Sequence, residues 1–206
     1  MFDLKRKRNS TSDDEQEDES SEEKQMDVIQ IDNNVYFHTS VSIKSILLLV
    51  TALQKAARFA LNESLYFKDS PNRMKVHLYI HSDGGDAYAG ISAMAHIRRC
   101  PVDVVTIADG FVASAATFLL LAGKERRMCA NSKVLIHQLR TGFWGKYSDL
   151  LDEVKNTKDL MRTVKKIYKK NTNMEKSQIN ELLKAEITLN AQKCLDANII
   201  HVIEPY

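Results

Sequence analysis

Three short segments in the middle of the chain contain the residues that could do chemistry. Ser114 lies in a run of small residues, His137 ends an apolar run, and a Gly84-Gly85 pair precedes both of them. A serine hydroxyl becomes a nucleophile when a histidine takes its proton, and free backbone N–H groups stabilise the oxyanion that then forms. The combination predicts acyl transfer through a serine.

Each of these residues also has an ordinary structural explanation. A serine such as Ser114 at the start of a helix is typical of an N-cap, and a Gly-Gly pair is more often a simple turn. A lone histidine at the end of a strand, such as His137, is usually structural. The occurrence of all three in one region favours the catalytic interpretation over the separate structural ones.

The predicted secondary structure places these residues at the ends of elements. Apolar periodicity predicts strands at 28–31, 35–37, 75–81, 102–107, 134–136 and 199–203, and helices at 42–61, 87–98, 148–170, 177–184 and 190–196. We expect a tight turn at Gly110 and a helix that opens at Ser114, where unpaired N–H groups favour negative charge. The alternation of strands and helices predicts an α/β fold with right-handed crossovers.

The three segments resemble the signature blocks of the Clp protease proteolytic subunit family. They read SDGGDAYAG, GFVASAATFLL and NSKVLIHQ, and Gly85 lies 29 residues before Ser114 while His137 lies 23 residues after it. The likeness extends over about residues 28–203. It implies a ClpP/crotonase-like spiral of ββα units with a protruding strand-helix handle at about 138–172, and the activity of a serine endopeptidase.

The resemblance also implies a role for each site residue. Ser114 is expected to be the nucleophile and His137 the general base, and the backbone N–H groups of Gly85 and Ala115 are expected to form the oxyanion hole. The third member of the triad falls on Glu186, where the family has an aspartate. Either Glu186 orients the histidine with its longer side chain, or the triad is loose, or Glu186 is only a solvated charge. Other carboxylates near the site in sequence, without support from a motif, are Asp83, Asp86 and Asp149.

The segment after His137 is expected to form the handle. By resemblance, its glycine-bearing strand, with Gly142 and Gly145, holds an extended substrate through main-chain hydrogen bonds. Its long helix carries an apolar stripe that would join two heptameric rings of identical chains. Leu139 stands where family handles often have a proline.

The resemblance implies two kinds of partner, an AAA+ unfoldase and an unfolded polypeptide substrate. The chain has no GxxxxGK[ST] phosphate loop, so ATP would be hydrolysed by the unfoldase. Two alternatives remain open. One is a catalytically impaired structural ring subunit, and the other is a crotonase-like enzyme that acts on acyl-CoA thioesters.

Composition sets further expectations. Residues 1–27 contain five Lys/Arg and ten Asp/Glu with few apolar residues, which predicts a disordered tail before a peptidase domain at 28–206. The net charge of +2 gives no reason to expect nucleic-acid binding, and no run of residues resembles a signal peptide or a membrane span.

Three widely spaced cysteines indicate reduced thiols and a cytoplasmic location. His77 and His81 would lie about 13 Å apart along a strand, so we expect no metal, and no cofactor is expected either.

Overall fold

In the computed structural model, which describes residues 28–66 and 74–205, eight strands form one sheet. They are β1 (Val28–Ile31), β2 (Asn34–His38), β3 (Val76–Ser82), β4 (Val104–Ala113), β5 (Glu125–Cys129), β6 (Lys133–Leu135), β7 (Thr188–Leu189) and β8 (Val202–Glu204). The sheet order is β1-β2-β3-β4-β5-β8, and β6 pairs with both β4 and β7. The expected disordered tail at 1–27 lies outside the described residues.

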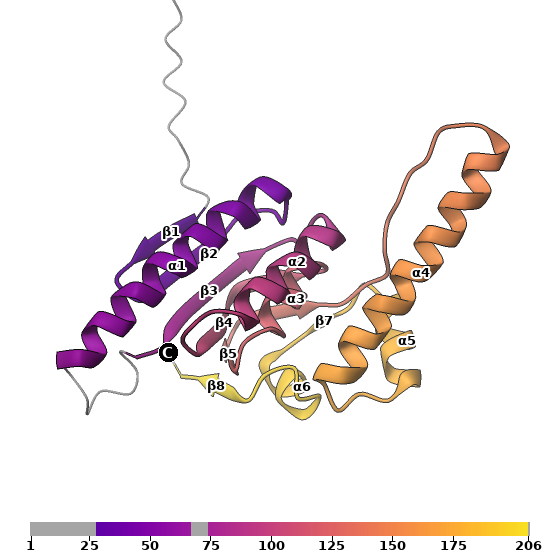
Figure 1. Cartoon of the computed structure of the whole chain (residues 1–206). Helices are drawn as coiled ribbons and strands as arrows, with labels where there is room; N and C mark the ends of the chain where they lie inside the picture. The colour runs from indigo at the N-terminus through magenta and orange to yellow at the C-terminus, as the bar shows by residue number, and fades with distance from the viewer. Residues whose placement is uncertain (1–27, 67–73, 206) are drawn as a thin grey trace, which may run out of the picture.

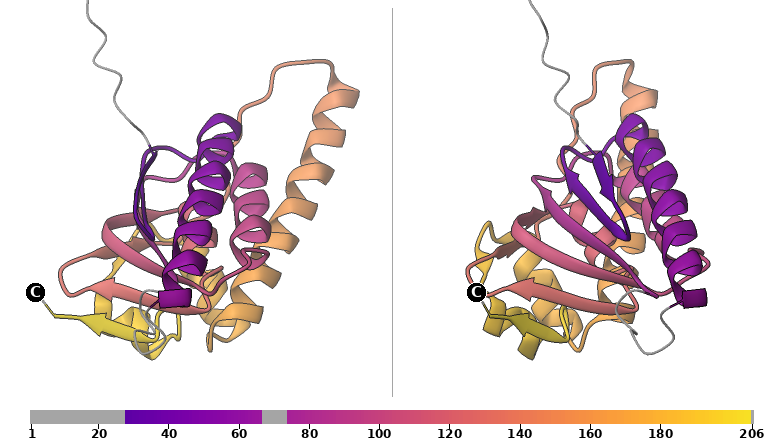
Figure 2. Two further views of the ribbon diagram at one scale, coloured as in Figure 1. Left: turned by 60° about the vertical axis from the view of Figure 1, so that its left-hand side comes forward. Right: turned by 90° about the vertical axis from the view of Figure 1, so that its left-hand side faces the viewer.

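Six helices accompany this sheet in the same described ranges. They are α1 (Ile43–Tyr66), α2 (Ala87–Arg98), α3 (Ala116–Leu120), α4 (Tyr147–Asn171), α5 (Lys176–Lys184) and α6 (Ala191–Asp196). Figures 1 and 2 show α1 and α2 side by side against one face of the sheet. The predicted mixed α/β architecture is therefore confirmed. None of these helices combines the length and the apolar character that a bilayer crossing needs.

The core lies between the sheet and the helices that cover it. In β3 the side chains of Val76, Leu78 and Ile80 are fully buried while the residues between them are more exposed, as the alternating sequence predicts. Leu49 and Leu53 of α1 pack into the same cluster. Strands β3, β4 and β6 pair in parallel in this order, so their carboxyl ends lie at one edge of the sheet, where Gly84-Gly85, Ser114 and His137 follow them.

Strand β4 is longer than predicted because Gly110 is not a tight turn. The first half of β4 pairs with β5, and its last three residues, Phe111 to Ala113, pair with β6. Gly110 lies between the two halves with φ 91°, and a Cβ there would lie 2.5 Å from Nδ1 of His81. The expected turn at Gly110 is therefore wrong: the glycine lets one strand pass from one neighbour to another, because it alone tolerates this backbone and this close contact.

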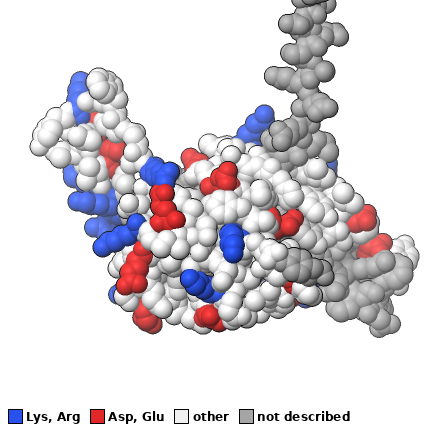
Figure 3. All heavy atoms as spheres, turned by 180° about the vertical axis from the view of Figure 1, so that it is seen from behind, with Lys and Arg blue, Asp and Glu red and all other residues white. Residues whose placement is uncertain are grey.

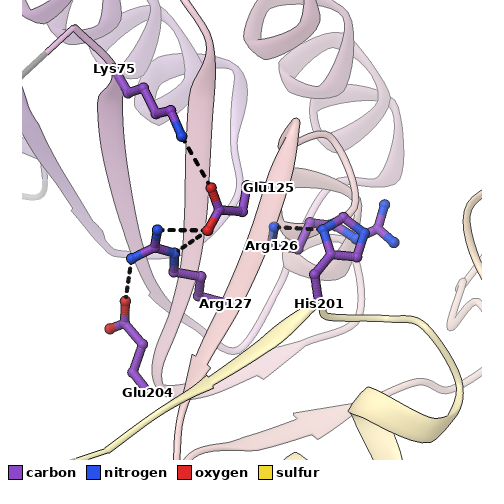
Figure 4. A network of polar contacts seen from close by, with 6 residues as sticks. All are labelled: Lys75, Glu125, Arg126, Arg127, His201 and Glu204. Atoms are coloured by element: carbon purple, nitrogen blue, oxygen red, sulfur yellow. Dashed lines mark hydrogen bonds and ion pairs between the residues drawn. The ribbon is translucent and has the colours of Figure 1, made fainter. Parts of the chain in front are cut away.

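Strand β5 is absent from the sequence-based prediction because it begins with three charged residues. The structure pairs these charges, as Figure 4 shows: Glu125 bonds to Lys75 and to Arg127, and Arg127 also bonds to Glu204 of β8. Arg126 is only 7% exposed, and it donates hydrogen bonds to the carbonyls of residues 198 and 199. This network ties the C-terminal segment to the far edge of the sheet, where β8 begins three residues later than predicted.

Helix α4 projects from the body of the molecule, and an extended segment leads up to its outer end (Figure 1). Near the body, Val164 and Tyr168 of α4 are buried. Figure 3 shows Lys and Arg side chains gathered along the projecting part. Large apolar side chains are also exposed on this projection: Phe143, Trp144, Tyr147, Leu150, Leu151 and Val154. Trp144 is 99% exposed, so the outer end of the projection has an apolar surface that this chain does not cover.

Candidate active site

Ser114 lies at a sharp turn between β4 and α3. Its φ angle is +53°, in the left-handed region that non-glycine residues rarely adopt, at a cost of about 1–3 kcal/mol. The N-cap of α3 is Ala115, without a side-chain cap. The explanation of Ser114 as an N-cap is therefore wrong, and its hydroxyl remains available on the half-buried turn. The backbone N–H of Ser114 donates a hydrogen bond to the carbonyl of Leu135, which ties the turn to the strand that leads to His137.

A second chain of hydrogen bonds holds the carbonyl of Ser114. The hydroxyl of Thr117 donates to this carbonyl at 2.6 Å and lies 2.7 Å from the hydroxyl of Tyr168. Thr117 has a single hydroxyl proton, so Tyr168 is the donor in the second bond. Burial raises the pKa of Tyr168 well above its usual range, which keeps this donor protonated. The buried base of α4 thus fixes the backbone of the strained turn.

The Gly84-Gly85 turn lies directly against Ser114. Val41 forms a parallel bridge with Gly85, donating from its N–H to the carbonyl of Gly84 and accepting from the N–H of Asp86, both at 2.8 Å. In this pattern the N–H of Gly85 points away from Val41, and it has no acceptor among the described residues. Both glycines have positive φ. A Cβ on Gly85 would lie 2.2 Å from the carbonyl oxygen of Val41, so only glycine fits.

Gly84 leaves no room for a side chain beside the serine. A Cβ there would lie 2.6 Å from Cβ of Ser114 and 2.7 Å from the carbonyl oxygen of Ala113. We therefore expect Gly84→Ala to displace the serine turn and to slow peptide cleavage by about a hundredfold or more, since it would disturb both the expected nucleophile and the expected oxyanion donors. The measurement is the turnover of a short fluorogenic peptide by the wild type and by Gly84→Ala, after circular dichroism has shown that the two proteins are equally folded. A cleavage rate within threefold of the wild type would contradict the conclusion that Gly84 must lack a side chain for the serine turn to form.

The second expected oxyanion donor is the backbone N–H of Ala115. It precedes the first turn of α3 and has no hydrogen-bond acceptor in the part of the chain that the structure describes. Because α3 has only five residues, the anion would be stabilised by individual N–H groups rather than by a long helix. Ala115 N lies 3.1 Å from the position that a Cβ of Gly84 would occupy, so the glycine turn lies close to this second donor.

His137 follows β6 and is half-buried. Its Nδ1 lies 2.6 Å from the carbonyl oxygen of Gln138. A carbonyl accepts but cannot donate, so Nδ1 carries the proton and Nε2 is left as the acceptor. This is the tautomer that a general base needs when it takes a proton from a serine hydroxyl. No hydrogen bond joins His137 to Ser114 within residues 28–66 and 74–205.

Glu186 is placed near His137 by the shortest strand of the sheet. Strands β6 and β7 are antiparallel, with Leu135 opposite Thr188. Continuing this register by two residues places Glu186 across from His137, at a spacing at which cross-strand side chains interact. In this structure the Glu186 carboxylate forms an ion pair with Arg140 instead, and no described contact joins it to His137 by a hydrogen bond. The orienting role of Glu186 stays a prediction.

These groups open onto one cleft of about 590 Å³ between the body and α4. Gly85, Ser114, Ala115 and His137 all line it, and the segment up to Thr141 and the inner face of α4 form its other walls. The structure thus brings together four of the predicted site residues. Glu186 is not among the residues that line it.

Of the remaining sequence-based candidates, Asp83 and Asp86 also line the cleft, and the others do not. Gly142 and Gly145 lie beyond Thr141 on the way to α4 and do not line the cleft. Asp86 caps α2 by accepting from Ala89, and Asp149 accepts from the N–H of residue 146 at the start of α4. Asp83 lines the cleft. In the described ranges, no three His, Cys, Asp or Glu side chains lie close enough together to hold a metal ion, so the His77 and His81 pair is not part of such a group.

Three residues of the site have no sequence signal that identifies them beforehand. Thr117 lies three residues after Ser114, a spacing that allows its hydroxyl to bond to the Ser114 carbonyl. Such a spacing is common in helices, so it does not indicate a functional residue. Tyr168 and Arg140 reach the site only through tertiary contacts, Tyr168 from 51 residues beyond Thr117 and Arg140 from 46 residues before Glu186.

Comparison with known proteins agrees with this geometry. A sequence profile described as "Clp protease" matches residues 30–205. A protein of Oltmannsiellopsis viridis called "ATP-dependent Clp protease proteolytic subunit" is 30% identical over 138 residues, 66% of this chain and 71% of its own length. A protein of the same name from Deinococcus radiodurans is 31% identical, over 66% of this chain and 68% of its own length. "ATP-dependent Clp protease proteolytic subunit 2" of Treponema denticola is 33% identical, over 62% and 65%.

Proposed function

Because the chain belongs to the Clp protease family, we propose that it is a serine endopeptidase, the proteolytic subunit of an ATP-dependent, self-compartmentalising protease. The observation that carries this proposal is the shared cleft. Ser114, His137 and the N–H groups of Gly85 and Ala115 all line it, although they come from three separate segments of the chain. This is the set of groups that cleavage of a peptide bond through a serine requires.

The proposed reaction follows from the hydrogen bonding of each group. Nε2 of His137 takes the proton of the Ser114 hydroxyl as the oxygen attacks a peptide carbonyl. The resulting oxyanion accepts hydrogen bonds from the N–H groups of Gly85 and Ala115, which are preorganised by the Val41 bridge and by the start of α3. The imidazolium then protonates the leaving amine, and water hydrolyses the acyl-enzyme by the same steps.

The approach of Ser114 to His137 needs only a side-chain movement in this proposal. The backbones are already tied, since the N–H of Ser114 bonds to Leu135, two residues before His137. Catalytic hydrogen bonds are often long or unformed in a free enzyme and form when the substrate or a partner subunit binds. A catalytically impaired ring subunit would not need the unpaired N–H of Gly85 or the tautomer of His137, so the active subunit is favoured.

The segment after His137 would hold the substrate. The backbone N–H groups of residues 139–145 make no described hydrogen bonds to other backbone groups. An extended substrate could therefore add to this segment as a strand. We place Gly142 and Gly145 at its outer end, where a substrate would leave the cleft.

The exposed apolar face of α4 supports assembly of identical chains. Buried in a second copy, the side chains of Trp144, Tyr147 and Leu151 would no longer contact water. Helix α1 adds a second exposed apolar face, with Ile43 and Leu47. We propose two heptameric rings stacked through α4, with the clefts facing an internal chamber. Native mass measurement tests this, since fourteen chains of 23.4 kDa are expected in one particle.

An AAA+ unfoldase would deliver unfolded polypeptides to this chamber, and it would hydrolyse the ATP. The names of the relatives, which include the words "ATP-dependent" and "proteolytic subunit", support this. We propose that the assembly works in the cytoplasm, without nucleic acid, membrane, metal or cofactor.

Glu186 is expected to contribute through His137. We expect Glu186→Ala to lower kcat by about a hundredfold or more, because a carboxylate beside the imidazole stabilises the imidazolium that forms in the transition state. Glu186→Asp is expected to retain cleavage, since the charge remains. The matched control is Glu181→Ala, which removes an exposed carboxylate five residues earlier. Equal turnover by all four proteins would show that another group orients the histidine.

The direct test of the function is labelling of Ser114 by a fluorophosphonate probe, together with cleavage of a short peptide. We expect stoichiometric labelling of the assembled protein and loss of cleavage in step with labelling. Unlabelled but fully assembled protein would identify a structural ring subunit. Binding of an acyl-CoA thioester without labelling would identify a crotonase-like enzyme.

A further inference from the structure

Arg140 forms an ion pair with Glu186, the carboxylate to which we assign the orientation of His137. We propose that Arg140 is a positioning residue that holds Glu186 away from His137, so that the triad is completed only when this ion pair opens. The inference rests on the roles proposed above for Ser114, His137 and Glu186.

The geometry gives the Glu186 carboxylate two alternative partners. Glu186 lies two residues before β7, across from His137, and Arg140 lies three residues after His137 on the segment that leaves β6. In this conformation Glu186 bonds to Arg140, and Nδ1–H of His137 donates to the carbonyl of Gln138. In the closed arrangement both the Glu186 carboxylate and Nδ1–H of His137 therefore have a partner. Opening it exchanges these two bonds for one between Glu186 and His137.

The charges around Glu186 favour its ionised form. The hydrogen bond and the charge of Arg140 lower the pKa of Glu186 below its usual range, and the charge of His137 acts in the same direction. Glu186 is thus ionised at neutral pH, with two cationic or potentially cationic groups beside it. A glutamate reaches one carbon–carbon bond further than an aspartate, so its carboxylate can swing between the two.

The ion pair is weak enough to act as a reversible restraint. The side chains of Arg140 and Glu186 are 71% and 61% exposed. Ion pairs of this exposure shift an equilibrium between two conformers by only about 1.5- to 5-fold, and salt screens them. Arg140 would therefore reduce the population of the completed triad without preventing its formation.

The test compares steady-state kinetics of the full-length assembled protein and its Arg140→Gln variant on a short fluorogenic peptide. At low ionic strength we expect kcat to rise about two- to fivefold in Arg140→Gln while KM stays unchanged. The wild type should approach the kcat of the variant as NaCl is raised, and the variant should respond much less. Arg140→Lys keeps the positive charge and should behave like the wild type.

A matched control separates this effect from a general change of charge. Arg162 forms an ion pair with Asp159 on α4, and these two side chains are 70% and 72% exposed, much like the proposed pair. Arg162→Gln should leave kcat and its salt dependence unchanged. Native mass measurement on every variant ensures that rates are compared at the same state of assembly.

The decisive comparison repeats Arg140→Gln in a Glu186→Ala background. If Arg140 acts through Glu186, the gain in kcat disappears there, whereas the same gain in both backgrounds overturns the inference. A fall in kcat, or no change, on Arg140→Gln also overturns it. Failure of the site assignment itself gives a different result. Ser114 would then remain unlabelled by fluorophosphonate in every variant, and this result would overturn both the proposed active site and the role of Arg140.

Discussion

Replacing Ser114 by alanine is expected to abolish peptide cleavage, with a fall in kcat on the order of 10⁶. The substitution removes only the hydroxyl group, but no covalent acyl-enzyme can form without its oxygen. The oxyanion donors of Gly85 and Ala115 do not depend on the serine side chain, so we expect slow residual hydrolysis above that in water. Turnover of a fluorogenic peptide and fluorophosphonate labelling measure the two consequences in the same sample.

The control for this variant is Ser177→Ala, which removes an exposed hydroxyl on α5 that does not line the cleft. It should retain full turnover. Native mass should show that Ser114→Ala still assembles, because the hydroxyl makes no hydrogen bond to another described residue. If Ser114→Ala retained cleavage within tenfold of the wild type, another residue would be the nucleophile.

Replacing His137 by alanine is expected to lower kcat by a similar factor, on the order of 10⁶. His137 is the one histidine among the described residues that line the cleft, so its loss removes the expected acceptor of the serine proton. The double variant Ser114→Ala with His137→Ala should be no slower than either single variant, because the two groups act as one unit. This lack of additivity is measured with the same fluorogenic peptide.

The histidine control is His96→Ala, which changes an exposed imidazole on α2. It should leave turnover unchanged. Additive losses in the Ser114 and His137 double variant would mean that the two side chains act independently, and so would contradict the proposed proton transfer between them.

The sequence predicted most of the fold because most elements have strong local periodicity. The alternation in β3 and the apolar stripes of α1 and α4 specify which faces are buried, whatever lies opposite. Strand β5 escaped prediction because its first residues, Glu125 to Arg127, are all charged. Their burial depends on partners more than 40 residues away, such as Lys75 and Glu204, which no local pattern contains.

The sequence also indicated Ser114, His137 and the glycine pair as candidates, since each lies in a recognisable block at the end of an element. The sequence did not predict the backbone conformation at Ser114. Strands β5 and β6 pair with successive parts of β4 on either side of Gly110, and Ser114 adopts a positive φ directly after β4 ends. The result is a strained turn rather than a helix cap.

Thus the sequence by itself determined the α/β architecture, the Clp protease family and the candidates for nucleophile and base. Only the tertiary structure decided which carboxylate and which cation accompany them. The pairing of β7, a strand of only two residues, with β6 brings the segment of Glu186 to the segment of His137, and Glu186 there forms an ion pair with Arg140. Periodicity in a sequence reports which residues are buried, whereas contacts between residues about 50 positions apart depend on how the elements pack.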